Sequence, residues 1–212
     1  GDRIPELVRN AVLAAEDSDF YKHAGLDYLG MARAMYKNVR DGRFSQGAST
    51  ITQQVAKTFF LTSERTIQRK LKEVVLARRL EHELTKDEIL YLYLNQIYWG
   101  HGRYGIGEAA RFYFNKTDLE SLTLAEAALL AGMIAAPERF SPYRAKNGTK
   151  SAERRAFVLE QMARNQFITR EAADAAKLEP IRIAEQKDRD PVMGLAPYAV
   201  DMVRRQMIRE LG

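Results

Sequence analysis

The chain has 212 residues, of which 46% are hydrophobic and 29% charged, and its formal net charge is +5 with a pI near 9.4. A chain of this length can bury a hydrophobic core and favours a single domain. Its mild positive charge favours anionic partners such as phosphates, nucleic acid or an acidic membrane surface. The absence of cysteine excludes disulfides, thiolate catalysis and cysteine-ligated zinc.

Helical periodicity dominates the sequence and strand-like alternation is scarce, which predicts an all-α fold. Pro5 suits the first turn of a helix that runs toward Glu16. Two later helices begin with capping boxes, at 85–88 and 123–126. The helices expected after the first lie at about 28–39, 49–60, 64–84, 85–98, 123–136, 151–165, 169–177 and 199–211.

The helix expected at 64–84 is amphipathic, and on or near its apolar stripe lie Ile67, Leu71, Val74, Val75 and Leu84. No segment of the sequence is long and apolar enough to span a membrane. The nearest candidate, at 122–136, is too short and contains Glu126. Residues 187–191 are typical of a linker.

Residues 16–25 combine acids, a histidine, an aromatic ring and a glycine where a helix gives way to a loop. If the helix continued, Glu16, Phe20 and His23 would share one face. A carboxylate beside an aromatic ring and shielded from water is suited to act as a base or acid. The alternative is that Glu16 and Asp17 form a solvated helix end and that His23 is structural.

A second polar cluster lies at 47–54 and continues to Lys57. Ser49, Gln53 and Lys57 are spaced to share a helix face, with Thr50 and Gln54 alongside. Hydroxyls, amides and an ammonium suit sugar hydroxyls and phosphate oxygens, but the same pattern fits the polar outer face of an amphipathic helix. Ser49 has no base partner that the sequence can identify, so we do not expect it to be a nucleophile.

Arg69, Lys70 and Glu73 form a third cluster on one side of the helix at 64–84. They could clamp a diphosphate leaving group, with the carboxylate orienting the cations. They could equally be a surface ion pair that contributes only about 0.3–0.5 kcal/mol. The apolar run at 59–61 just before this basic helix is either core or a patch that dips into a bilayer.

The string at 100–105 matches G-x-G-x-x-G, but no alternation of strands and helices surrounds it. We therefore interpret it as a glycine-rich turn between helices.

As a set, these clusters resemble the motifs of the peptidoglycan glycosyltransferase (transglycosylase) domain of class A penicillin-binding proteins, glycosyltransferase family 51. The first motif, Glu-Asp-x-x-Phe-x-x-His-x-Gly, is complete at 16–25, and the second, Gly-x-Ser-Thr-Ile-Thr-Gln-Gln, at 47–54. The third, Arg-Lys-x-x-Glu, lies at 69–73. The fourth, with Lys-x-Glu-Ile-Leu and Tyr-Leu-Asn, lies at 86–95.

The resemblance implies an all-α, lysozyme-like helical domain with a smaller membrane-proximal helical lobe. This domain would cover residues 4–185, and residues 186–212 would be a linker and helix leading toward an absent downstream domain. Transpeptidase motifs are absent from the chain. The resemblance also implies a place at the outer, periplasmic side of the cytoplasmic membrane, with the anchor missing from this chain.

The resemblance implies lipid II and lipid-linked glycan as substrates, joined with inversion into linear β-1,4 glycan with release of polyprenyl diphosphate. Glu16 would be the catalytic base and Glu73 would organise the diphosphate side. Substrate or diphosphate binding would fall to Ser49, Gln54, Lys57, Arg65, Arg69 and Lys70. Supporting roles would fall to Asp17, Phe20, His23, Gly47, Thr50, Gln53, Glu88 and Asn95.

No cofactor is required under this resemblance and no metal ligands are expected, although a divalent cation (Mg²⁺ or Mn²⁺) could assist the diphosphate. Expected partners are the membrane surface and the phosphoglycolipid inhibitor moenomycin, and nucleic acid is not expected. Two alternatives stay open at this point: a lysozyme-like glycan hydrolase with two carboxylates, and a basic helical nucleic-acid-binding module, for which no recognition motif is present.

Overall fold

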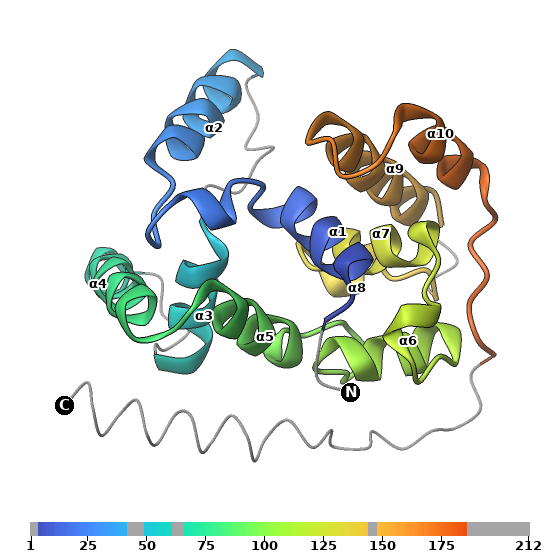
Figure 1. Ribbon diagram of the computed structural model, residues 1–212, viewed down its shortest axis with the longest axis horizontal. Coiled ribbons are helices and arrows are strands. Elements are labelled where there is room, and N and C mark those ends of the chain that lie inside the picture. The colour runs from blue at the N-terminus through green and yellow to red at the C-terminus, as the bar shows by residue number, and fades with distance from the viewer. Residues whose placement is uncertain (1–3, 42–48, 61–65, 144–147, 186–212) are drawn as a thin grey trace. The chain divides into compact units, whose positions relative to one another are not determined.

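The computed structural model describes residues 4–41, 49–60, 66–143 and 148–185, and no strand occurs within them. One isolated antiparallel bridge joins Tyr98 and Tyr104. The all-α prediction is therefore confirmed for the described residues (Figure 1). Their helices are α1 (Glu6–Glu16), η1 (Phe20–Lys22), α2 (Tyr28–Asp41), α3 (Ile51–Phe60), α4 (Ile67–Glu83), α5 (Lys86–Gln96), α6 (Ile106–Phe114), η2 (Leu119–Ser121), α7 (Leu124–Met133), α8 (Pro137–Phe140), α9 (Gly148–Arg164) and α10 (Arg170–Leu178).

The chain divides into two compact units, which are described separately. The small unit is Glu16–Tyr93 and contains the end of α1, then η1 to α4 and most of α5. The large unit is Gly1–Ala15 with Leu94–Gly212 and contains most of α1 and the helices from α6 onward. Whether residues 4–185 behave as one domain stays a prediction.

The small unit is built around the contact between α3 and α4. Helix α3 buries Ile51, Val55 and Ala56, while α4 buries Ala77 and Leu80. Because apolar side chains recur every three or four residues on each helix, the two buried faces can pack along their length. Residues of the second polar cluster are thereby carried on a helix that is fixed in the core.

Helix α4 packs with a different face from the one that its apolar residues indicate. The side chains of Ile67, Leu71 and Val75 are 83%, 63% and 54% exposed. They recur every four residues and so form one stripe along the outside of the helix, here called the α4 stripe. Only Glu73, Ala77 and Leu80 of this helix are buried. An amphipathic pattern alone does not decide which face meets the core, and here the core takes the less apolar one.

Gly25, the last residue of the first motif, lies at a point of close chain approach. Its φ is +86°, in the left-handed region that favours glycine. A Cβ there would lie 3.1 Å from the carbonyl oxygen of Ala77 and 3.1 Å from Cγ of Glu81, both on α4. Any side chain at this position would push the loop away from α4.

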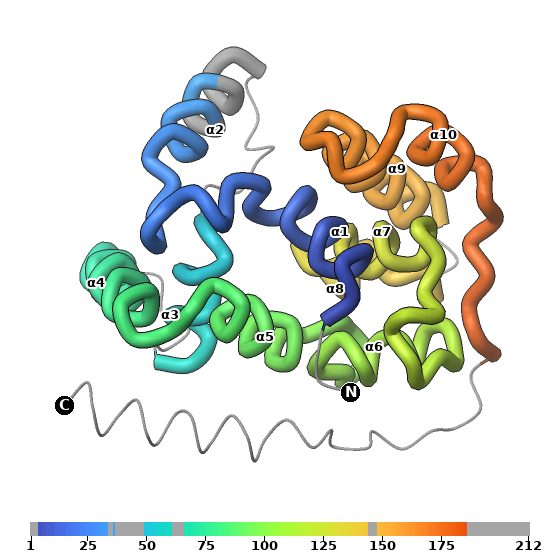
Figure 2. The backbone as a smooth tube through the Cα atoms, viewed as in Figure 1, coloured from blue at the N-terminus to red at the C-terminus, as the bar shows by residue number. Residues whose placement is uncertain are grey.

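The large unit has α7 at its centre, and this helix is buried on almost every side. It packs mainly against α9 and also contacts α6, α8 and α10. The backbone after α10 runs extended to residue 185 (orange in Figure 2). This segment is held at Ala184, whose N–H donates to Tyr113 O at 2.8 Å and whose carbonyl accepts from the Tyr143 hydroxyl at 2.6 Å.

Several boundaries differ from the predictions. Helix α6 was not expected, because it is short and directly follows the glycine-rich string. That string forms the turn between α5 and α6, as predicted, with positive φ at Gly100, His101, Gly102 and Gly105. The helix expected at 123–136 ends at Met133, and a separate short helix, α8, begins at Pro137. The predicted linker and last helix at 187–211 lie outside the described residues.

Candidate active site

Glu16 is the last residue of α1 and is half-buried. The helix stops there, and the 3-10 turn at Phe20–Lys22 is separate. The single continued helix that would place Glu16, Phe20 and His23 on one face is therefore not formed. Instead, Gln54 Nε2 on α3 donates a hydrogen bond to Glu16 Oε2 at 3.1 Å. The carboxylate is thus held by the second motif.

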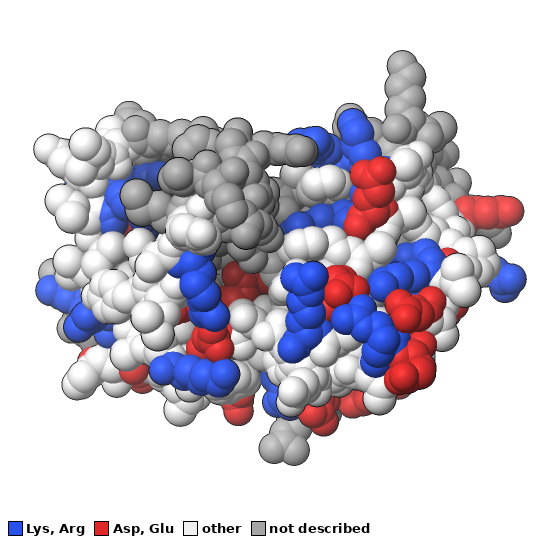
Figure 3. All heavy atoms as spheres, turned by 90° about the horizontal axis from the view of Figure 1, so that it is seen from above, with Lys and Arg blue, Asp and Glu red and all other residues white. Residues whose placement is uncertain are grey.

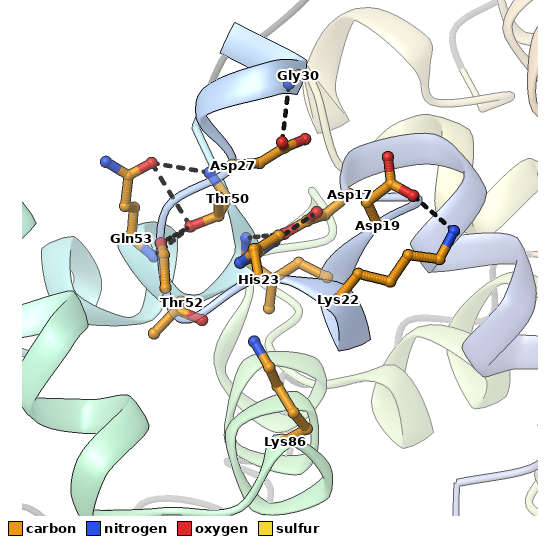
Figure 4. A network of polar contacts seen from close by, with 12 residues as sticks. Asp17, Asp19, Lys22, His23, Asp27, Gly30, Thr50, Thr52, Gln53 and Lys86 are labelled. Atoms are coloured by element: carbon orange, nitrogen blue, oxygen red, sulfur yellow. Dashed lines mark hydrogen bonds and ion pairs between the residues drawn. The ribbon is translucent and has the colours of Figure 1, made fainter.

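Asp17 fixes the start of α3. Its buried carboxylate accepts from the backbone N–H of Ile51, the first residue of that helix, at 3.0 Å. The same carboxylate lies 3.0 and 3.1 Å from Nε2 of His23. Figure 4 shows Asp17 and His23 pointing toward each other in this network. A carboxylate at a helix N-terminus satisfies an otherwise unpaired donor and complements the helix dipole. Asp17 and His23 are therefore structural supports of the loop that follows Glu16.

Thr50 and Gln53 form a capping box at the same helix end (Figure 4). The Thr50 N–H donates to Gln53 Oε1 at 2.9 Å, and the Gln53 N–H donates to Thr50 Oγ1 at 3.2 Å. The Thr50 hydroxyl also donates to the carbonyl of Gly25 at 2.7 Å. Gln53 is only 1% exposed. It therefore lies neither on a polar outer face nor in open contact with solvent, and its amide serves the cap.

The third motif places a lysine between two oxygens. Lys70 Nζ donates to Ser49 Oγ at 3.1 Å and is paired with Glu73 Oε1. Glu73 is 3% exposed. Because a buried carboxylate without a cation would be costly, Glu73 holds Lys70 in place beside Ser49. The Nε of Arg69 is buried and has no hydrogen-bond partner among the described residues, which leaves a donor available at this position.

A separate polar network, formed by Thr52, Glu81 and Lys86, connects α3, α4 and α5 within the small unit. Glu81 accepts from the Thr52 hydroxyl and from Lys86 Nζ, the latter at 2.7 Å. Lys86 Nζ also lies 4.3 Å from the ring centroid of Phe20. The buried Phe20 ring is therefore covered by a cation, and it anchors the first motif to the start of the fourth. Sequence reasoning predicted no role for Glu81 or Lys86. The feature that could have indicated one was Lys86 itself, because it is the first residue of the fourth motif.

The other predicted residues have simpler surroundings. Lys57 is exposed on α3. Glu88 forms the predicted capping box, accepting from the N–H and hydroxyl of Thr85 at 2.8 and 2.7 Å, and these bonds lower its pKa. Asn95 belongs to the large unit. Gly47 and Arg65 lie outside the described residues.

Tyr93 is the functional candidate that sequence reasoning missed. Its hydroxyl donates to Gln54 Oε1 at 3.0 Å, although the side chain is 1% exposed. The signal was present in the fourth motif, because Tyr93 is the tyrosine of its Tyr-Leu-Asn string. It was hidden because a tyrosine at a core position of a helix is usually there for packing.

Several basic side chains among the described residues are in ion pairs. Figure 3 shows basic side chains interspersed with acidic ones on the face that it draws. Glu160 of the large unit is an example, since it pairs with Arg164, Arg170 and Lys177. In the small unit, Lys70 pairs with the buried Glu73 and also donates to the Ser49 hydroxyl. The chemistry available in the small unit is therefore a held carboxylate together with a lysine placed beside the start of the same helix, α3.

A comparison with known protein families identifies the family of the chain. The model of the transglycosylase family matches residues 1–163, and the chain belongs to that family. This membership confirms the resemblance read from the motifs and the predicted class of enzyme, a peptidoglycan glycosyltransferase.

Its relatives are penicillin-binding proteins. Penicillin-binding protein 1A of Haemophilus influenzae is 47% identical over 210 residues, which cover 99% of this chain and 24% of that protein. Penicillin-binding protein 1A of Escherichia coli K12 is 45% identical over 211 residues, covering 100% of this chain and 24% of that protein. The chain thus spans about a quarter of the length of these relatives. A crystal structure of the Haemophilus influenzae protein aligns with 76% of this chain and 20% of that chain, at 33% identity and a TM-score of 0.44.

Proposed function

We propose that this domain polymerises lipid II into linear β-1,4 glycan with inversion at the donor sugar. One observation carries the proposal: the two ends of the required chemistry are attached to the same helix, α3. Gln54 of α3 binds the Glu16 carboxylate, and Ser49, just before α3, accepts from Lys70. Because the base and the cationic leaving-group site are both attached to one rigid helix, the distance and orientation between them are fixed.

In the proposed reaction, Glu16 takes the proton from the attacking hydroxyl of the acceptor sugar as that oxygen attacks C1 of the donor. The C1–oxygen bond to the polyprenyl diphosphate breaks, and the electron pair leaves with the diphosphate. Since the donor linkage is α, a single displacement gives the β product.

Arg69 and Lys70 stabilise the negative charge that develops on the leaving diphosphate. Lys70 is already aimed by Glu73 and Ser49, so little reorganisation is needed when the diphosphate arrives. The guanidinium of Arg69 supplies a second positive charge, and its Nε has no hydrogen-bond partner among the described residues. Ser49, Gln54, Lys57 and Arg65 would line the side of the site that takes the donor.

A divalent cation would act as a counter-ion bound through the diphosphate itself. Within the part of the chain that the structure describes, no three histidine or acidic side chains are grouped so that they could hold a metal ion. No protein cage for Mg²⁺ or Mn²⁺ is thus part of the proposal among the described residues, and no step of the proposed reaction depends on one.

The small unit is proposed as the membrane-proximal lobe of a lysozyme-like architecture. Its α4 stripe exposes Ile67, Leu71 and Val75, and Lys72 is exposed on the same helix. Apolar side chains beside cations suit the interface of a bilayer with anionic headgroups. No helix among the described residues could cross a bilayer by itself. The domain would then work at the outer face of the cytoplasmic membrane, where lipid II is presented.

The test is incubation of the 212-residue chain with lipid II in detergent, followed by separation of products by size. We expect linear glycan that lysozyme digests, together with released undecaprenyl diphosphate. Release of short sugars from finished cell wall, with no growth from lipid II, would instead support a hydrolase. Fluorescent penicillin should leave no covalent label, because none of the seven serines has a lysine three residues on.

A further inference from the structure

Tyr93 is a buried polar residue to which the proposed reaction assigns no role. It lies on α5, is 1% exposed, and keeps its hydroxyl within 3.0 Å of Gln54 Oε1. The other end of the same amide, Nε2, lies 3.1 Å from Glu16 Oε2. Three side chains from α5, α3 and α1 therefore form a continuous chain of two hydrogen bonds that ends on the candidate base.

The direction of these two bonds is set at both ends, because the Glu16 carboxylate can only accept and the Tyr93 phenol has a proton to donate. Burial raises the pKa of Tyr93 well above its ordinary value, and the negative charges of Glu16 and Asp17 raise it further. The hydroxyl therefore stays protonated at neutral pH and can donate a hydrogen bond to the amide oxygen. With the oxygen turned toward Tyr93, the two N–H groups of the amide can only face the other way, toward Glu16.

We propose that Tyr93 is a positioning residue for Glu16. Its hydroxyl holds the Gln54 amide in the one orientation that binds the Glu16 carboxylate. The amide in turn keeps that carboxylate in the rotamer from which it meets the acceptor hydroxyl. Tyr93 acts only through Gln54 and does not contact the reacting atoms.

The structure gives a physical reason for the relay. Glu16 ends α1, and the chain turns away directly after it. A side chain at a helix end is less confined by the helix than one in the middle, and a misplaced reacting group costs rate. If the amide flipped, its oxygen would face a carboxylate, and this repulsion would move Glu16. Tyr93 favours the unflipped amide because its hydroxyl supplies the donor that the amide oxygen needs on the side away from Glu16.

The inference rests on the proposed function, and the experiment separates the two. The 212-residue chain is prepared as wild type, Tyr93→Phe, Gln54→Met and the double variant, and kcat and KM for lipid II are measured. Tyr93→Phe keeps the ring and loses one buried hydrogen bond, so kcat should fall roughly three- to tenfold, with KM and moenomycin binding unchanged. The double variant should be no slower than Gln54→Met alone.

Tyr113→Phe is the matched control. Tyr113 is also fully buried, and its hydroxyl donates to the carbonyl of Trp99 at 2.8 Å in the large unit. The control should lose comparable thermal stability but keep wild-type kcat. A purely structural role of Tyr93 would make the two variants behave alike. An unchanged kcat in Tyr93→Phe, a rise in KM alone, or losses that multiply in the double variant would overturn the relay.

A readout that needs no turnover keeps the relay testable if wild type fails to polymerise lipid II. The side-chain NH₂ protons of Gln54, assigned by their loss in Gln54→Met, should exchange with water slowly while the amide is held. In Tyr93→Phe we expect exchange to be roughly three- to tenfold faster, the effect of one lost hydrogen bond. An unchanged exchange rate would refute the relay, whatever the activity, whereas an inactive wild type would count against the proposed function alone.

Discussion

Glu16 and Gln54 lie 38 positions apart in the sequence, and Nε2 of Gln54 donates to Oε2 of Glu16 at 3.1 Å. This hydrogen bond joins the first and second motifs of the family directly. Glu16 is consequently held from α3, and Lys70 is held from the residue just before α3, through Ser49. Disturbing either contact should affect turnover more than folding.

Glu16→Gln tests the base. The substitution keeps the size of the side chain but removes the carboxylate that accepts the proton. We expect the rate of polymerisation to fall by at least about 10²-fold, the usual cost of losing a general base. Circular dichroism and moenomycin binding should stay normal. Turnover near that of wild type in a folded Glu16→Gln enzyme would remove Glu16 from the mechanism.

Lys70→Ala tests the leaving-group site. Loss of a cation aimed at the developing charge should lower kcat by about 10²-fold and weaken moenomycin binding. The variant leaves Glu73 buried without its partner, which also destabilises the fold. The double variant Lys70→Ala with Glu73→Gln removes that buried charge, and it should recover stability without recovering activity.

Lys72→Ala is the control for this comparison, because Lys72 is exposed on the same helix. In detergent solution it should stay within about twofold of wild type, as is usual for a solvated side chain. If Lys70→Ala binds moenomycin as tightly as Lys72→Ala does, the diphosphate is held elsewhere.

The α4 stripe should mediate membrane binding. Leu71→Ser with Val75→Ser removes two side chains that are 63% and 54% exposed, so folding should be unaffected. Full burial of such a side chain is worth about 1.5–3 kcal/mol, and shallow insertion of both should give at least about fivefold weaker cosedimentation with anionic vesicles. Tyr104→Ser, also exposed but in the large unit, serves as control. Equal loss in both variants would assign the effect to a general change in surface polarity.

The apolar run at 59–61 is a separate candidate for membrane insertion. Phe59 and Phe60 are half-buried on α3, and their insertion stays a prediction; Leu61 lies outside the described residues.

Gly25→Ala should destabilise the protein. The left-handed φ of +86° costs an L-residue roughly 1–2 kcal/mol, and the new Cβ would crowd the carbonyl of Ala77. Thermal unfolding measures the loss. Gly107→Ala is the matched control, because nothing lies within 4 Å of its Cβ position in α6, and it should stabilise the protein by about 0.5–1 kcal/mol. Equal effects at the two positions would contradict the close approach seen at Gly25.

Stability at low pH should depend on Glu160. Hydrogen bonds from Arg170, then Lys177 and Arg164, lower its pKa from 4.5 to about 2. Because the folded-state pKa is depressed, this carboxylate stabilises the fold above pH 4.5, and the stabilisation is lost as pH falls from 4.5 toward 2. Glu160→Gln should flatten the fall of melting temperature over this interval. The difference should shrink in high salt, since the group is exposed; an identical pH profile in both proteins would show that the pairs do not persist in solution.

The sequence by itself determined the helical class, most helix positions and the family. These features depend on neighbouring residues: the helical period, the capping box of Thr85 and Glu88, and motifs a few residues long. Helix α6 and the break before α8 were missed because the helices are short and follow turn residues. Only the tertiary structure decided which faces are buried. A polar or apolar pattern does not name its partner, and so Gln53 became a buried cap while Leu71 remained exposed.

The site shows the same division. Glu16, Lys70 and Glu73 could be named from motifs, because their chemistry resides in the residue types. The residues that hold these groups in place could not be named from the motifs. The Tyr93 hydroxyl and the Glu16 carboxylate are linked through Gln54 only when α1, α3 and α5 are packed together. Such contacts join residues 38 and 39 positions apart, beyond any local pattern. They form because burial in the core leaves each polar atom only its folded neighbours to bind.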